Sequence, residues 1–162
     1  SIRIFKAGCR CRLFPEAWVW HKRRTDFRKF FRQVFNSGIA RINLYKKYPE
    51  SLKLVHMLPM VFTVGVCALV LTSAVGRVLM EYDGIHKWYW LCAGPWLPIL
   101  FYCFLIFADS SVSNKSLKVG LLSVPAAFIQ LFGYGCGFLT AWWKRCLKGQ
   151  DEFHAFDKTF YK

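Results

Sequence analysis

The sequence is poor in acidic side chains, and three long stretches lack charge altogether. Only nine Asp and Glu residues stand against 23 Lys and Arg residues, which gives a net charge of +14. This imbalance predicts an anionic partner, and a hydrophobic content of 55% predicts a lipid bilayer as one partner. Because no recognised nucleic-acid-binding module accompanies the basic residues, we expect no nucleic acid partner.

Metal-binding and phosphate-binding motifs are also scarce. None of the seven cysteines forms a Cys-x-x-Cys motif, and Cys9-x-Cys11 alone is a weak metal signal. Four cysteines lie inside apolar stretches, where free thiols pack as small hydrophobic groups. The run Gly133-Tyr-Gly-Cys-Gly137 has no preceding strand, so it does not predict a dinucleotide loop. Gly133 and Gly137 share one helix face and predict close helix packing instead.

The uncharged stretches are the strongest structural signal in the chain. No Lys, Arg, Asp or Glu occurs in residues 54–76, 88–108 or 119–143. A helix needs about 20 such residues to cross the hydrocarbon core, where backbone groups must be satisfied within the segment. We therefore expect a membrane domain over residues 54–143, with segments at about 54–78, 88–108 and 119–143. No signal peptide is visible at the N-terminus.

The distribution of basic residues predicts the orientation. Fourteen of the 23 Lys and Arg residues precede Leu54, so we expect the N-terminal region to be cytoplasmic in a multi-pass protein of the bacterial cytoplasmic membrane. Full spanning by the third segment would then place the basic tail, residues 144–162, outside the cell. That conflicts with the positive-inside tendency. Either the tendency fails here, or the third segment is re-entrant or lies at the interface; Pro125 and Gln130 within it are compatible with the second option.

Shorter elements precede the membrane domain. We predict a helix that ends at Gly8, strands over residues 9–14 and 17–21, and a helix from an N-cap at Thr25 to about Tyr45. Residues 1–24 would form one unit, and residues 25–53 a basic amphipathic helix with its linker.

This expected helix carries one apolar stripe and one exception to it. The stripe consists of Phe27, Phe30, Phe31, Val34, Phe35, Gly38, Ile42 and Tyr45. Such a helix lies in the headgroup plane or packs against a domain, and both can hold together. Arg41 falls inside the stripe, between Phe30 and Val34 on the helical wheel. Either Gly38 ends the regular helix and resets its phase, or Arg41 points at a bound phosphate, since a charge there needs an anionic partner.

The run from Pro15 to Arg41, PEAWVWHKRRTDFRKFFRQVFNSGIAR, resembles the end of the catalytic domain in bacterial membrane-bound family-2 glycosyltransferases. The later runs LKVGLLSVP and GYGCGFLTAWWKR look like those of such enzymes from gut-type anaerobes. The resemblance implies a short α/β remnant of a GT-A catalytic domain, then an amphipathic interface helix, then two or three transmembrane helices. The expected fold class is thus mainly α, in a membrane.

The resemblance also implies site residues. His21 would be a ligand of a divalent metal, Mg²⁺ or Mn²⁺, or a contact of the donor diphosphate, and Arg24, Gln33 and Arg41 would bind that diphosphate. Gln33 and Arg41 stand roughly where processive members carry a Gln-x-x-Arg-Trp motif, but the spacing is longer and the Trp is missing, so processivity does not follow. The family's metal-binding Asp-x-Asp motif and its Glu-Asp pair, which supplies the catalytic base, do not occur in these 162 residues.

These observations lead to two expectations. The first is the C-terminal membrane-anchoring part of an enzyme that transfers a sugar from a nucleotide sugar to a lipid-linked or polymeric glycan. This piece would hold no catalytic residue and would be inactive alone. The second is a small, non-enzymatic cationic membrane protein that serves as an assembly or lipid-binding subunit. The coding sequence upstream of Ser1 would separate the two.

Overall fold

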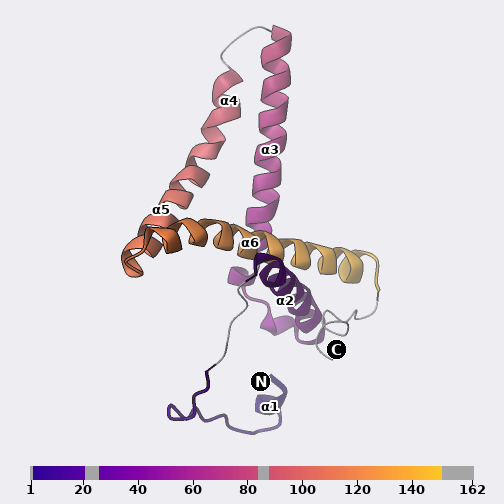
Figure 1. Cartoon of the computed structure of the whole chain (residues 1–162). Helices are drawn as coiled ribbons and strands as arrows, with labels where there is room; N and C mark the ends of the chain where they lie inside the picture. The colour runs from indigo at the N-terminus through magenta and orange to yellow at the C-terminus, as the bar shows by residue number, and fades with distance from the viewer. Residues whose placement is uncertain (1, 21–25, 84–87, 151–162) are drawn as a thin grey trace.

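The computed structural model describes residues 2–20, 26–83 and 88–150, and within these ranges the protein is mostly helical and contains no strand (Figure 1). The elements follow the order α1 (Ile2–Lys6), α2 (Phe27–Lys47), the 3-10 turns η1 (Pro49–Ser51) and η2 (Leu54–His56), α3 (Leu58–Asp83), α4 (Tyr89–Ala93), the 3-10 turn η4 (Gly94–Trp96), α5 (Leu97–Ser113), α6 (Leu117–Trp142) and the π-helical turn η5 (Trp143–Leu147).

The predicted α/β remnant is wrong for the described residues. α1 ends as expected before Gly8, which has a φ of 75° and donates its backbone N–H to Phe5 O over 3.0 Å. Residues 9–20 form neither of the two expected strands. Their side chains are exposed, including Trp20 at 92%. A strand is stabilised by a neighbouring strand and by burial of one face, and this segment has neither here.

Helix α2 matches the predicted amphipathic helix with two corrections. Its N-cap is Asp26, whose side chain accepts a hydrogen bond from Arg28 N over 2.7 Å; the predicted cap, Thr25, lies outside the described residues. The helix also continues through Gly38 to Lys47. The hypothesis that Gly38 ends the helix and resets its phase is therefore wrong.

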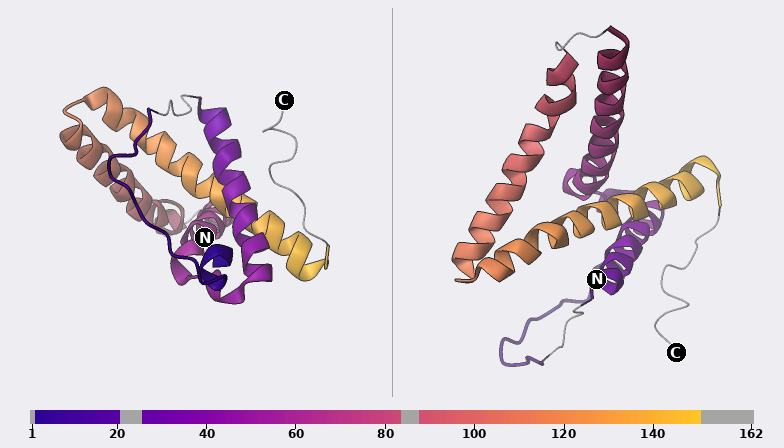
Figure 2. Two further views of the ribbon diagram at one scale, coloured as in Figure 1. Left: turned by 90° about the horizontal axis from the view of Figure 1, so that it is seen from below. Right: turned by 45° about the horizontal axis from the view of Figure 1, so that its top comes forward.

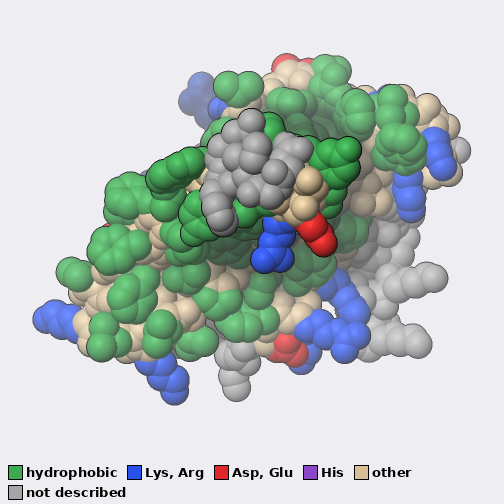
Figure 3. All heavy atoms as spheres, turned by 90° about the horizontal axis from the view of Figure 1, so that it is seen from above, with side chains coloured by type: hydrophobic (Ala, Val, Ile, Leu, Met, Phe, Trp, Pro, Cys, Tyr) green, Lys and Arg blue, Asp and Glu red, His purple; other side chains and the backbone are tan. Residues whose placement is uncertain are grey.

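Three helices are long and apolar enough to cross a membrane, by length and composition: Leu58–Tyr82, Gly94–Ser113 and Leu117–Leu147. Many of their large apolar side chains are exposed, for example Leu71, Phe101 and Leu121 at 63–66%. Seen from above, hydrophobic side chains cover most of the visible face, and Lys and Arg side chains gather mainly at its margins (Figure 3). These features indicate a membrane protein, as the uncharged stretches predicted.

Helices α3 and α5 form a hairpin. α3 runs away from α6, and α4, η4 and α5 bring the chain back toward it (Figure 1). Just past the middle of α3, Trp96 Nε1 donates to Ser73 Oγ over 2.8 Å, and Ser73 Oγ donates to Cys92 O over 3.2 Å. These hydrogen bonds join α3 to α4 and η4, and they give Ser73 Oγ and Trp96 Nε1 partners within the protein in an apolar part of the chain.

Helix α6 does not run alongside the hairpin but lies across one end of it (Figures 1 and 2). Its contacts are consistent with that placement. Thr63, in the second turn of α3, donates its hydroxyl to Pro59 O and also lies 3.5 Å from Leu131 O of α6. At the first turn of α6, Gly120 lies against Phe107 and Ser111, near the end of α5. Rings from three helices meet between these points, with Phe62 next to Tyr102, Phe128 and Phe132.

Helix α2 crosses α6 on the side away from the hairpin (Figures 1 and 2). Glycines on both helices allow this close approach. A Cβ at Gly38 would lie 2.7 Å from Phe138 N, and one at Gly137 would lie 2.8 Å from Phe35 C. Gly133 lies against Val34 in the same way. The predicted packing role of Gly133 and Gly137 is confirmed.

The small core lies at this crossing. The buried hydrophobic residues are Ile39, Ile42, Phe138 and Ala141, and Phe35, Leu52, Met57, Met60, Tyr134 and Cys146 pack against them. The cluster joins α2, α6 and the start of α3. It therefore fixes the basic helix against the membrane helices at one end of the hairpin.

Candidate functional site

Two of the four predicted site residues can be placed. His21 and Arg24 lie outside the described residues. Gln33 is exposed on α2, and its backbone carbonyl accepts a hydrogen bond from Ser37 Oγ over 3.0 Å. Arg41 is half-buried two turns further along α2. Gln33 and Arg41 are eight residues apart, about 80° around the helix at 100° per residue, so the fold does not place them side by side.

The surroundings of Arg41 are basic. The pKa of His56 is lowered from its ordinary value, first by desolvation and then by the positive charges of Arg41 and Lys53. His56 Nδ1 also accepts a hydrogen bond from Lys53 N over 3.0 Å, which requires that nitrogen to be unprotonated. His56 is therefore neutral near pH 7, and two cations remain beside it.

Within the described part of the chain, the guanidinium of Arg41 forms no ion pair, and the ion pair found there joins Lys6 Nζ to Glu50 Oε1 over 3.2 Å. The pKa of Glu50 is lowered by a hydrogen bond from its own backbone and then by Lys6, so this carboxylate is ionised and occupied. A half-buried cation without a carboxylate partner is suited to an anion from outside the described chain.

A second feature was not predicted from the sequence. Arg145 of η5 donates from Nη1 to Asn43 Oδ1 of α2 over 2.9 Å, and its Nε is buried without a partner. Asn43 and Arg145 are 102 residues apart in the sequence, so no local pattern predicts their contact. This contact holds the basic end of α6 against α2.

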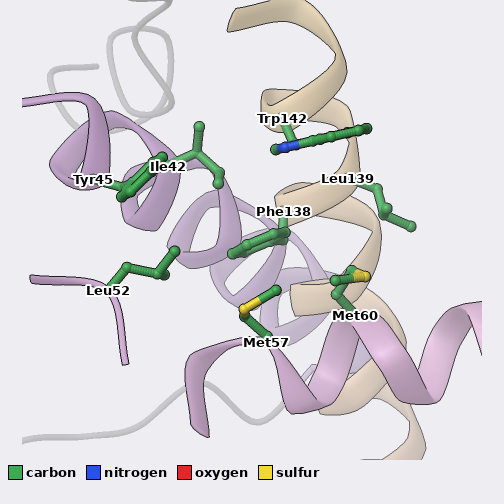
Figure 4. A pocket seen from close by; sticks show the side chains of 8 residues that line it. All are labelled: Ile42, Tyr45, Leu52, Met57, Met60, Phe138, Leu139 and Trp142. Carbon is green, nitrogen blue, oxygen red and sulfur yellow. The ribbon is translucent and has the colours of Figure 1, made fainter. Parts of the chain in front are cut away.

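An apolar pocket of about 320 Å³ opens beside the core cluster (Figure 4). It is lined by Ile42 and Tyr45 from α2, Leu52, Met57 and Met60 from the linker and the start of α3, and Phe138, Leu139 and Trp142 from α6. A second, shallower depression adjoins it and shares Tyr45 and Trp142; Lys46, Pro49 and Cys146 complete its lining. We call the two together the α2–α6 groove. The apolar pocket alone, at about 320 Å³, lies at the lower end of the usual range for ligand pockets, ~300–1,000 Å³.

The described residues do not offer a metal site. No group of three or more His, Cys, Asp or Glu side chains lies close enough together to hold a metal ion in this part of the chain. The metal expected from the resemblance would need ligands that these residues do not supply.

The helical periodicity of the sequence predicted the apolar face of α2. The sequence features that indicate the groove are weaker. Trp142-Trp143 followed by Lys144-Arg145 at the end of an apolar run is typical of a membrane–water boundary. Met57 and Met60 flank Pro59, at the entry to the first membrane helix. The sequence does not predict that the end of the third apolar run lies beside the start of the first. Comparison with protein-family models, curated proteins and solved structures finds no match for this chain.

Proposed function

We propose that this chain is the C-terminal, membrane-anchoring part of a glycosyltransferase that takes a nucleotide sugar at the cytoplasmic face of a bacterial membrane and glycosylates a lipid-linked or polymeric glycan. The observation that carries the proposal is the rigid placement of the basic helix α2 across the end of a membrane hairpin. The resemblance of residues 15–41 supplies the reaction class.

The geometry supports this role in physical terms. Glycosyl transfer leaves a nucleoside diphosphate, and fixed cations stabilise the charge that develops on it. Arg41 is half-buried on a helix whose apolar face packs against α6, and it lacks a carboxylate partner among the described residues. A guanidinium in that position offers a planar fork for phosphate oxygens.

The experiment uses the reading frame that contains this chain. Membranes carrying the whole frame should transfer labelled sugar from a nucleotide-sugar mixture into the lipid or glycan fraction, and membranes carrying residues 1–162 alone should not. Upstream of Ser1 the frame should encode an Asp-x-Asp motif and, close to Ser1, a Glu-Asp pair. A start codon just before Ser1 with a stop codon upstream would favour the rival reading, a non-enzymatic cationic subunit.

The mode of membrane attachment gives a direct prediction. We expect the protein to stay in the membrane fraction through washes with high salt or at alkaline pH and to need detergent for release. Salt screens the attraction between basic residues and headgroups but does not expose buried apolar surface. Sedimentation followed by immunoblotting measures this. Release by salt alone would mean that only α2 binds the bilayer.

The crosswise position of α6 gives a prediction for topology. If α3 and α5 span and α6 lies at the interface, Asn36 of α2 and Gln150 after η5 face the same side. The basic residues of both ends would then be cytoplasmic, as the positive-inside tendency favours. Single cysteines at the two positions, in a chain whose seven native cysteines are replaced, should react with a membrane-impermeant maleimide from the same side of sealed vesicles. Labelling from opposite sides would show that α6 spans.

A further inference from the structure

The α2–α6 groove has the features of a lipid site that the glycosyltransferase proposal does not require. Its deeper part, about 320 Å³, is bounded by apolar side chains that include Met60, Phe138 and Leu139 (Figure 4). Its shallower part is bounded by Lys46 and Cys146. The groove therefore runs from a hydrocarbon-like interior to a cationic edge, and a ligand that fills both parts has an apolar tail and an anionic head.

Most of the charged side chains near the groove are basic. Lys46 and Lys47 end α2, and Lys53 precedes η2. The acid closest in sequence, Glu50, forms its ion pair with Lys6 over 3.2 Å, and no ion pair to Lys46 is found among the described residues. An anionic headgroup at this edge would lie close to Lys46, for which the described acidic residues provide no ion pair.

The position of the groove in the fold identifies the source of such a ligand. Met57 and Met60 stand where the first membrane helix begins, and Trp142 stands where α6 ends. Tyr45 and Trp142 border both parts of the groove. Aromatic side chains of this kind concentrate where hydrocarbon gives way to headgroups. At that depth the ligand that is always present is a membrane lipid.

We propose that the α2–α6 groove binds an anionic phospholipid of the bilayer, with one acyl chain between α2, α6 and the start of α3, and with its phosphate at Lys46. The bound lipid would fill the space beside the core cluster and join α2 to the membrane helices. This site is independent of donor binding at Arg41.

The test is photocrosslinking of the purified full-length protein in nanodiscs of phosphatidylcholine doped with a phosphatidylglycerol that carries a diazirine on one acyl chain. Mass spectrometry should find the crosslink in peptides that contain Met57–Met60 or Phe138–Trp142. Unlabelled phosphatidylglycerol should compete for the site, and additional phosphatidylcholine should not.

Matched variants sharpen the result. Leu139→Trp and Met60→Trp should fill the groove and abolish the specific crosslink. Lys46→Gln leaves the apolar part intact and should weaken competition by phosphatidylglycerol about fivefold, the effect expected for one basic residue near an anionic headgroup. The controls are Leu121→Trp, at an exposed site in the first half of α6, and Lys29→Gln, at an exposed site in the first turn of α2. Both should leave the crosslink unchanged.

Four outcomes would overturn the proposal. The first is crosslinking that survives both filling variants. The second is equal competition by unlabelled phosphatidylglycerol in the Lys46→Gln variant and the wild type. This comparison also tests the proposal if the tryptophan variants fail to fold. The third is displacement of the probe by a polyprenyl phosphate at far lower concentration than by phosphatidylglycerol. This result would mean that the groove binds a polyprenyl phosphate in place of a phospholipid. The fourth is a large rise in crosslinking after deletion of residues 151–162, which would mean that the chain's own C-terminal segment covers the groove. Loss of sugar transfer with the crosslink intact would count against the proposed function alone.

Discussion

Replacing Gly137 with alanine should separate α2 from α6 or strain their crossing severely. A Cβ at this position would lie 2.8 Å from Phe35 C and 3.1 Å from Phe35 Cα, and backbone atoms of a packed helix cannot turn aside as a flexible side chain can. Overpacking of this kind costs ~1–3 kcal/mol, and for a chain of this size that lowers Tm by roughly 2–12 °C. Thermal unfolding of the detergent-solubilised protein measures the change.

The chain offers a matched control in Gly65 of α3, where an added Cβ meets nothing within 4 Å. Gly65→Ala should leave Tm unchanged or raise it, because alanine loses less backbone entropy than glycine in a helix. Gly137→Ala should also make the α2 backbone more sensitive to trypsin at Arg32, because α2 would no longer be held against α6. Equal Tm values for the two variants would show that the α2–α6 crossing is looser than described.

The sequence predicted those parts of the fold that depend on local chemistry. The three uncharged runs correspond to α3, to α4 with η4 and α5, and to α6. They are helical because backbone groups in an apolar setting must pair within the segment. The apolar stripe of α2 follows from helical periodicity, although Ile39, outside the predicted stripe, is among its buried residues. Both predictions rest on interactions between residues close in the sequence.

The failures have a common cause in long-range geometry. The apolar residues of segments 9–14 and 17–21 are compatible with strands, but a strand needs a partner, and the described part of the chain places no strand beside residues 9–20. One of the two hypotheses for Arg41 made Gly38 a helix end, because glycine often follows the last turn of a helix. In the structure Gly38 lies inside α2 and allows the backbone of α6 to approach closely. The groove likewise arises only because α6 crosses the end of the hairpin.

The last expectation concerns Arg41. The hypothesis that Gly38 resets the helix phase is wrong, and the hypothesis of a bound phosphate stays a prediction. Helix α2 is continuous through Gly38, and its buried residues are Gly38, Ile39 and Ile42. Arg41 is half-buried and lies at the edge of this buried face, not in its middle as the predicted stripe implied. His56 beside it is neutral, and Lys53 adds a second cation. An anion that binds there would find preorganised positive charge, and this charge is most valuable where negative charge develops on a leaving diphosphate.

We therefore expect Arg41→Ala in the intact enzyme to lower the rate of sugar transfer by about 10²-fold, the scale of removing one preorganised stabilising donor. Arg41→Lys should rescue only part of the loss, because an ammonium cannot reproduce the bidentate fork. Arg28→Ala and Lys29→Ala are the controls, since both side chains are exposed in the first turn of α2. Initial rates against donor concentration in native membranes give kcat and KM separately. If Arg41 were merely structural, its replacement would lower Tm without a specific change in kcat or KM. If Arg41→Ala and Arg28→Ala behave alike, Arg41 does not bind the donor diphosphate.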